Sequence, residues 1–277
     1  MRSNSLSSQS TILLLVVAGL FVSSQACTGL PFLAPTATPT ATPTDTPTTT
    51  PTRTRRPTST ATSTATRTPT ATLTLTPTIT PTTSYLDWPV VLSESFDYDN
   101  GAWETGKNET DYVTYDYSIT DGKYLMKMTA KQPVFWGFII DVDLHADFYF
   151  SIEVKKDKAS DKSNYGLIFR FDQYDKYFFN INAAGKQYAV DVNSDNAWKK
   201  ILYWRNSERI DPSGSNQLAV LARASQYALF INGEEVDSFS DDTLDAGKVG
   251  FAYNLYQAGE YMKLELDNFE VRAPSVG

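Results

Sequence analysis

Three acidic residues near the end of the chain have a spacing that could support acid/base chemistry. Glu265, Asp267 and Glu270 fit the pattern E-x-D-x-x-E. Retaining glycoside hydrolysis needs two carboxyl groups about 5–5.5 Å apart beside the sugar. The apolar residues of this segment alternate as far as Leu266 and then step by three, which predicts a β-bulge at positions 267–268. We therefore expect both glutamates on the solvated face of a strand rather than in a catalytic pair.

Clusters of Asp and Asn could offer oxygen ligands to calcium, a hard cation. The clusters are Asp97, Asp99 and Asn100, then Asp172 and Asp175, and finally Asp241 and Asp242. Asp and Asn also dominate turns for backbone reasons alone, and no EF-hand spacing is present. One structural calcium ion with unassigned ligands remains an open expectation, and no other cofactor is expected.

The chain has one histidine and one cysteine, which restricts other chemistry. His145 lies in the segment DVDLHAD, where polar and apolar residues alternate, so we expect an ordinary surface or strand-end residue. A Ser-His-Asp triad has no support from this single histidine. Cys27 can form neither an intramolecular disulfide nor a cysteine metal cluster.

Residues 1–26 have the three parts of a secretory signal, namely an early arginine, an apolar run at 11–22 and small residues before Cys27. The apolar run is shorter than the about 20 residues that span a bilayer. A cysteine directly after the cleavage point resembles the bacterial lipoprotein signal, which implies lipid attachment at Cys27. That signal normally has Leu where this chain has Ser24, and the alternative is secretion with a free thiol.

Residues 27–84 are predicted to form a disordered stalk rich in Thr and Pro. The stretch 36–83 is about half threonine with regularly placed prolines, so it cannot bury enough apolar area to fold. Proline keeps such a chain extended. We expect an exported lipoprotein at the bacterial cell surface or the outer face of the membrane, held to the membrane through its lipid alone.

The charge of the chain is unevenly distributed. Residues 1–84 carry five basic and one acidic side chain, so nineteen basic and thirty-one acidic side chains remain in residues 85–277, a net charge of −12. Nucleic-acid binding draws most of its affinity from Lys and Arg that neutralise phosphates. We therefore exclude nucleic acid as a partner of this domain.

The pattern of apolar runs and turn residues in 85–277 predicts an all-β domain. Short runs rich in Val, Ile, Phe and Tyr alternate with turn residues every 8 to 12 positions, and no helical period is visible. Asp121-Gly122 and Asn232-Gly233 favour two-residue hairpin turns, because both positions need positive φ. Fourteen short strands without helices indicate two packed sheets.

A central hairpin, 164–182, provides the candidate binding residues. A turn of Gln173, Tyr174 and Asp175 would pair Phe171 with Tyr177, Phe169 with Phe179 and Leu167 with Ile181, all on one apolar face. The opposite face would combine polar and apolar groups that suit a ligand. The predicted ligand-binding residues on it are Arg170, Phe178, Asn180 and Asn182.

Aromatic side chains are the other candidates for contact with a sugar ring. The candidates are Trp103, Trp136, Trp198, Trp204, Tyr149 and Tyr174. Trp and Tyr in a sandwich first fill the space between the sheets, so we expect most of them in the core.

The succession of motifs resembles the concanavalin A-like lectin/glucanase superfamily. The resemblance rests on E-S-F-D at 94–97, G-x-x-F-R-F-D at 166–172, Trp198 and Trp204, N-x-L-x-V at 216–220, I-N-G at 231–233 and D-N-F-x-V at 267–271. More narrowly, the chain is similar to the 3-keto-disaccharide hydrolase-like and laminin-G-like bacterial domains. The likeness implies a two-sheet jelly-roll sandwich with a concave sheet. The E-x-D-x-x-E spelling also matches the catalytic pattern of family-16 glycoside hydrolases, which carry it mid-chain among aromatic residues that are absent here.

These observations predict a lectin-like module whose concave sheet binds glycans or a cell-envelope partner. The first alternative is an extracytoplasmic sugar hydrolase, as the narrower resemblance implies, and the second is a structural adhesion domain. Convergent carboxylates in a deep cleft would favour the hydrolase.

Overall fold

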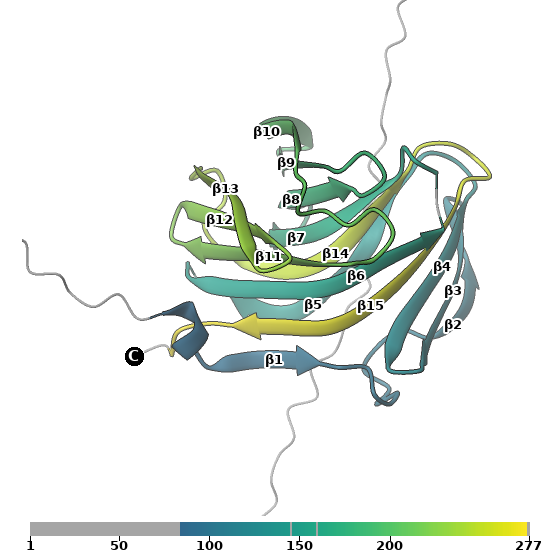
Figure 1. The fold of residues 1–277 in the computed structure, drawn as a ribbon, viewed down its shortest axis with the longest axis horizontal. Coiled ribbons are helices and arrows are strands. Elements are labelled where there is room, and N and C mark those ends of the chain that lie inside the picture. Colours follow the sequence, from purple (N-terminus) through teal and green to yellow (C-terminus); the bar gives the residue numbers. More distant parts are fainter. Residues whose placement is uncertain (1–83, 145, 159, 276–277) are drawn as a thin grey trace, which may run out of the picture. The chain divides into compact units, whose positions relative to one another are not determined.

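The computed structural model describes residues 84–275, apart from residues 145 and 159. The predicted signal peptide, Cys27, nearly all of the predicted stalk and His145 lie outside the described residues. The predicted all-β sandwich is confirmed: two antiparallel sheets face each other, and the described part of the chain contains no α-helix (Figure 1).

Fifteen strands follow one short 3-10 helix, η1, at Tyr85–Asp87. They are β1 (Val90–Glu94), β2 (Gly106–Glu109), β3 (Val113–Thr120), β4 (Lys123–Ala130), β5 (Val134–Leu144), β6 (Phe148–Lys158), β7 (Asn164–Asp172), β8 (Asp175–Asn182), β9 (Gln187–Ser194), β10 (Ala197–Asn206), β11 (Ser215–Arg223), β12 (Gln226–Ile231), β13 (Glu234–Ser240), β14 (Gly247–Leu255) and β15 (Tyr261–Arg272).

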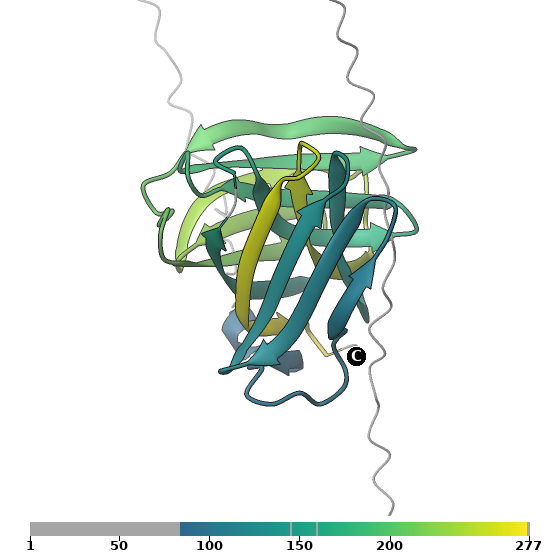
Figure 2. The same ribbon diagram turned by 90° about the vertical axis from the view of Figure 1, so that its right-hand side faces the viewer.

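The nine-stranded sheet has the order β13-β12-β11-β6-β15-β4-β3-β2, and β1 pairs with the second half of β15. Figure 2 shows β15 in yellow beside β4, β3 and β2 at the front. The six-stranded sheet has the order β10-β9-β8-β7-β14-β5. Consecutive strands form hairpins at the ends of each sheet, while strands far apart in the sequence pair in the middle, where β6 and β15 join one sheet and β14 joins β7 to β5 in the other.

The space between the sheets holds one large apolar core. Alternation along each strand produces it: Met262, Leu264 and Leu266 of β15 are buried while the residues between them are more exposed. Trp103 and Trp136 also lie in this core, as expected for most of the tryptophans.

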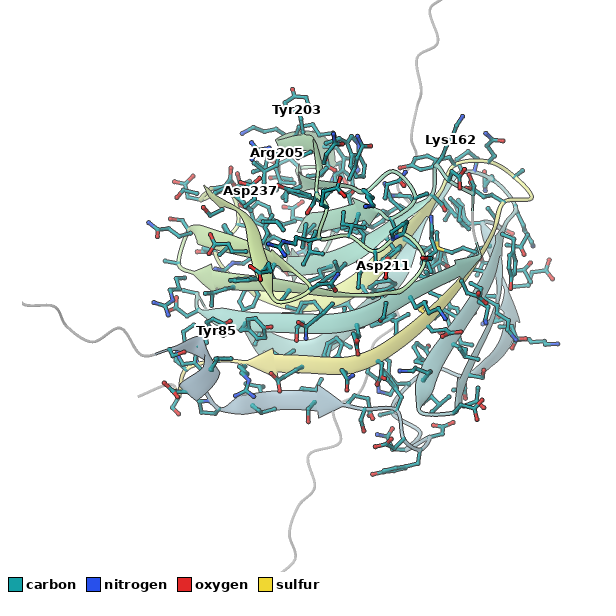
Figure 3. The ribbon with its side chains drawn as sticks, viewed as in Figure 1. Tyr85, Lys162, Tyr203, Arg205, Asp211 and Asp237 are labelled. Atoms are coloured by element: carbon teal, nitrogen blue, oxygen red, sulfur yellow. The ribbon has the colours of Figure 1, made fainter. Side chains whose placement is uncertain are left out.

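The free edges of the two sheets are joined at one side of the sandwich. Arg205 of β10 forms an ion pair with Asp237 of β13, and both side chains are labelled in Figure 3. The hydroxyl of Tyr188 in β9 donates to the same carboxylate at 3.1 Å. These contacts hold β10 against the edge of the opposite sheet.

The start of the domain is fastened to the outer face of the nine-stranded sheet. The ring of Tyr85 stacks on Tyr149 of β6 with 4.7 Å between the centroids (Figure 3). The guanidinium of Arg272 donates to the carbonyls of Leu86 and Trp88 at 3.0 and 3.2 Å. The chain therefore enters the domain at the nine-stranded sheet.

No helix among the described residues is long and apolar enough to cross a membrane.

Candidate functional site

The register of the central hairpin differs from the prediction by two residues. Phe169 pairs with Tyr177, and Asp172 pairs with Asp175, so the turn consists of Gln173 and Tyr174 alone. Between these pairs β7 has two residues and β8 has one, which is a β-bulge. The bulge reverses the side chains beyond it, so Phe171 leaves the core for the opposite face of the sheet.

Arg170 is the residue at this bulge, with φ of +55°, and its predicted place on the ligand face is wrong. The side chain is fully buried. Its guanidinium donates to the carbonyls of Asp245, Ala146 and Ala224 at 2.5, 2.6 and 2.8 Å, and to the hydroxyl of Tyr227 at 3.2 Å. Arg170 thus fastens loops at one end of the sandwich, because a buried guanidinium must satisfy its donors.

The outer face of the six-stranded sheet, hereafter the concave face, curls strongly. The ring centroid of Phe135 on the edge strand β5 lies 5.1 Å from that of Phe178 in β8 and 5.6 Å from that of Trp198 in β10, the opposite edge strand. Side chains from both edges can meet only if the sheet curls around them. A second apolar cluster fills the floor of this face, and it consists of Phe135, Ile139, Ile168, Phe171, Phe178 and Ala252.

Glycines allow this curvature. A Cβ at Gly166 in β7 would lie 1.9 Å from the carbonyl oxygen of Phe179, and one at Gly137 in β5 would lie 2.0 Å from that of Phe251. Neither position can carry a side chain while the neighbouring strand is so close. The two glycines flank Ala252 of β14, so the concave face carries no large side chain at these three paired positions.

Polar side chains connect five strands across the concave face, and we call them the amide row. Asn254 of β14 donates to Asn164 of β7 at 2.7 Å, and Asn164 donates to Asn180 of β8 at 3.4 Å. Asn180 donates to Asp191 of β9 at 3.2 Å. Asp191 in turn forms an ion pair of 2.6 Å with Lys200 of β10.

Exposed aromatic rings border the amide row at both ends. The Nδ2 of Asn164 donates to the hydroxyl of Tyr256 at 2.9 Å, and the ammonium of Lys200 lies 5.9 Å from the ring centroid of Trp204. Tyr256, Trp204 and Trp198 are exposed, while the asparagines between them are buried. We call these three exposed rings the rim. A ligand that approaches the concave face would contact the rim before the buried asparagines.

Lys176 of β8 is buried beside the rings of Phe135 and Trp198. Its ammonium lies 5.6 Å from the ring centroid of Phe135 and 5.1 Å from that of Trp198, and it donates to the carbonyl of Tyr174 at 2.5 Å. Burial lowers the pKa of this lysine to about 8, although the nearby carboxylate of Asp175 opposes the shift. Burial also raises the pKa of the Tyr256 hydroxyl, although its hydrogen bond with Asn164 opposes the shift.

Of the predicted ligand-binding residues, Phe178, Asn180 and Asn182 occupy alternate positions of β8 and face away from the main core. Arg170 does not share this face, because its side chain is buried against Tyr227. Asn182 is partly exposed and holds the next turn, since its oxygen accepts from Gly185 and its amide donates to Asp161. Sequence reasoning missed Asn164, Asn254, Asp191, Lys200 and Tyr256. A usable signal was the asparagine or aspartate at alternate positions of several apolar strands.

The E-x-D-x-x-E residues lie on the other sheet. β15 has the predicted bulge, with a register shift between Asp267 and Glu270 and with Asn268 at φ of +47°. Glu265 accepts from Lys263 at 3.2 Å, Asp267 is paired with Lys123, and Glu270 accepts two bonds from Arg272. Each carboxylate thus has a cationic partner at a strand surface, and Lys263 is shared with Asp157 at 2.7 Å.

The oxygen-rich loop at 97–100 uses its side chains to shape its own backbone. Asp97 accepts from the hydroxyl of Ser95 at 2.7 Å, Asp99 accepts from the backbone of Gly101, and Asn100 accepts from that of Ala102. Within residues 84–275, leaving aside 145 and 159, no three acidic, histidine or cysteine side chains gather as a metal-binding group. Calcium binding stays a prediction.

No protein-family model matches the chain, and no curated protein matches its sequence. Solved structures do resemble it. A protein of unknown function with a galectin-like fold from Bacillus subtilis is 11% identical with a TM-score of 0.50, over 66% of this chain and 95% of the other. A β-glucanase from Bacillus licheniformis is 7% identical with a TM-score of 0.50, over 66% and 97%. An endo-acting O-glycanase of the human gut microbiota is 10% identical with a TM-score of 0.50, over 67% and 99%. Identities this low show a shared jelly-roll fold and no more.

Proposed function

We propose that this protein is an exported, surface-anchored lectin-like module that binds glycans across its concave face. The observation that carries the proposal is the amide row, which runs from Asn254 to Lys200 across five strands and ends beside exposed rings. Sugars present hydroxyls around an apolar ring face, so they suit amides, carboxylates and ammonium groups placed next to aromatic side chains.

The rim and the row have different roles in this proposal. Trp204, Trp198 and Tyr256 are accessible and would stack on sugar rings, while Lys200 and the partly exposed Asp191 would bind hydroxyls. Asn180 is buried and donates to Asp191, so it positions that carboxylate rather than contacting the ligand. The known folds of lectin-like and glycanase type support a glycan as the partner at this coarse level. A cell-envelope protein would be the alternative occupant.

Anchoring through Cys27 and a Thr/Pro stalk is part of the proposal. The described chain begins at the outer face of the nine-stranded sheet, where Tyr85 stacks on Tyr149. Fractionation and mass spectrometry test the anchor: acyl chains on Cys27 would support it, and an unmodified protein in the medium would contradict it. At least two acyl chains are needed for stable attachment, since one chain binds only reversibly.

A glycan array probed with the full chain tests the binding function. Trp204→Ala should weaken binding to the bound glycans about tenfold or more, because a stacked ring in the rim is lost. Tyr203→Ala is the matched control, since Tyr203 is the adjacent residue of β10, is 74% exposed and points away at the top of Figure 3. Equal effects of the two substitutions would contradict the site. Release of new reducing ends from a bound glycan would instead identify a hydrolase.

A further inference from the structure

A polar hollow lies on the nine-stranded sheet, outside the amide row. It has a volume of about 340 Å³ and opens between the end of β1, the loop after β1 and the bulge of β15. This loop lies at the lower right in Figure 1. We call this cavity the tyrosine hollow. Its lining residues are Ser93, Glu94, Ser95, Tyr98, Asn100, Asn268, Phe269 and Glu270.

The loop that forms one wall is held in shape by buried and backbone contacts. The Oε1 of Glu94 accepts from the backbone of Phe96 at 3.0 Å, and its Oε2 accepts from Asn100 at 2.8 Å and from the indole of Trp103 at 3.2 Å. Trp103 is itself buried in the main core. The wall is therefore pre-organised, which lowers the entropic cost of binding.

Tyr98 stands on this rigid loop and is 72% exposed. A large aromatic ring at the mouth of a polar hollow gives a flat apolar surface on which a pyranose ring can stack. On the opposite wall, Glu270 is fixed by two bonds from Arg272 at 2.7 and 3.1 Å, so its carboxylate is oriented as an acceptor. The hydroxyl of Ser93, on the strand paired with Glu270, adds a donor.

We propose that the tyrosine hollow is a second sugar site, specific for neutral or amino pyranosides. Two carboxylates line it: Glu270 is paired with Arg272, whereas Glu94 accepts from uncharged donors only. The hollow therefore keeps the negative charge of Glu94, which a uronate or sulfated sugar would meet as like charge while an amino sugar would not. The site is built from β1 and β15 of the nine-stranded sheet and does not depend on the concave face. One chain would then hold two glycan segments, and binding to a polymer would gain avidity without a new contact.

Saturation-transfer NMR on the full chain tests this proposal with five probes: the methyl β-glycosides of glucose, galactose, N-acetylglucosamine, glucosamine and glucuronic acid. In a Trp204→Ala background, at least one of the first four should still receive saturation, and glucuronide should not. Adding Tyr98→Ala should reduce that transfer at least fivefold. Tyr174→Ala is the matched control, because Tyr174 is a 54% exposed turn tyrosine outside the hollow.

Each outcome decides a different claim. If Trp204→Ala alone abolishes transfer, or if Tyr98→Ala leaves it unchanged in that background, the second site is wrong and the concave face stands. If Tyr98→Ala abolishes transfer in the wild-type background while Trp204→Ala has no effect, the concave site is wrong and the tyrosine hollow stands. No transfer from the wild-type chain to any probe would overturn the hollow, while the glycan array would still decide the concave face.

Discussion

Phe135 and Trp198 lie on the two opposite edge strands of the six-stranded sheet, yet their ring centroids are 5.6 Å apart. The ammonium of Lys176 lies within 6 Å of both rings. The concave face is thus closed over at one end by contacts between its own edges. Access of a ligand to the floor requires these rings to separate, whereas the rim at Trp204 and Tyr256 is exposed without any movement.

Removal of Phe135 should open this contact. We expect Phe135→Ala to cost about 3–5 kcal/mol of stability, as for other buried Phe to Ala changes, and to expose Trp198 further. The measurement is tryptophan fluorescence, with a red-shifted emission and stronger acrylamide quenching. Phe239→Ala is the control, because Phe239 packs on Tyr177 and Tyr227 and is only partly buried. Unchanged quenching in Phe135→Ala would contradict the closed contact.

Lys176 should make stability depend on pH. Its pKa of about 8 in the folded chain is below the ordinary lysine value, so between pH 8 and about 10.4 the unfolded chain binds more protons than the folded one. Stability should therefore rise with pH through this window, by at most about 3 kcal/mol. Above about pH 10 the effect reverses, because buried tyrosines such as Tyr115, whose pKa is raised to about 12, stay protonated only in the folded chain.

Chemical unfolding between pH 7 and 9.5 measures this effect. Lys176→Met should be more stable than the wild type at pH 7 and should lack the rise, since it carries no charge to desolvate. Lys107→Met is the control, because the Lys107 side chain is 83% exposed and its contact with Asp116 is 4.0 Å. A wild-type curve that is flat or falls between pH 8 and 9.5 would show that the ammonium is solvated.

Gly166 should be intolerant of any side chain. Gly166→Ala places a Cβ 1.9 Å from the carbonyl oxygen of Phe179, so the strands must separate, at a cost of at least about 2 kcal/mol. Gly185→Ala is the matched control, since its Cβ would meet nothing nearer than 3.4 Å, and its stability should change by less than about 0.5 kcal/mol. Equal denaturation midpoints for the two variants would mean that the sheet relaxes freely at Gly166.

Much of the fold was predictable because alternation and turn chemistry are local signals. Asp121-Gly122 and Asn232-Gly233 both have positive φ at both positions, as two-residue hairpin turns demand. β2 was missed because its four residues, Gly106–Glu109, are all exposed and carry no apolar alternation. A strand held only by its neighbour leaves no hydrophobic pattern to detect.

The candidate site was less predictable because it depends on which strands become neighbours. Asn164 and Asn254 are 90 residues apart in the chain and meet only because β7 pairs with β14. The bulge at Arg170 was invisible for a different reason: a two-residue shift keeps the apolar pattern before the bulge and changes only the residues beyond it. Spacing alone could not distinguish a three-residue turn from a shorter turn with a bulge.

The acidic residues of β15 should contribute little to stability or to binding at the concave face. Glu265→Gln with Glu270→Gln removes two partners of surface ion pairs, each worth about 0–1 kcal/mol. Glycan binding in the Trp204-dependent site should be unchanged, because these residues belong to the other sheet. A loss of sugar hydrolysis in this double variant would contradict the assignment and show that the pair is catalytic.

Arg170 should be among the most important residues for stability. In Arg170→Ala the carbonyls of Ala146, Ala224 and Asp245 lose a donor inside the protein, and a cavity forms beside Tyr227. Each unsatisfied buried group costs about 1–3 kcal/mol, so we expect a loss of at least about 3 kcal/mol. Arg170→Lys should be intermediate, since an ammonium cannot span the same carbonyls in a planar fork. Denaturation midpoints measure both changes.

The comparison variant for Arg170 is Arg205→Ala. Arg205 is also an arginine that joins the two sheets, but its side chain is 50% exposed, in contrast to the buried Arg170. We expect this variant to lose less than about 1 kcal/mol. If Arg170→Ala stayed within about 0.5 kcal/mol of the wild type and weakened glycan binding, the guanidinium would be solvated. The bulge would then be absent in solution, and Arg170 would belong on the ligand face beside Phe178 and Asn180.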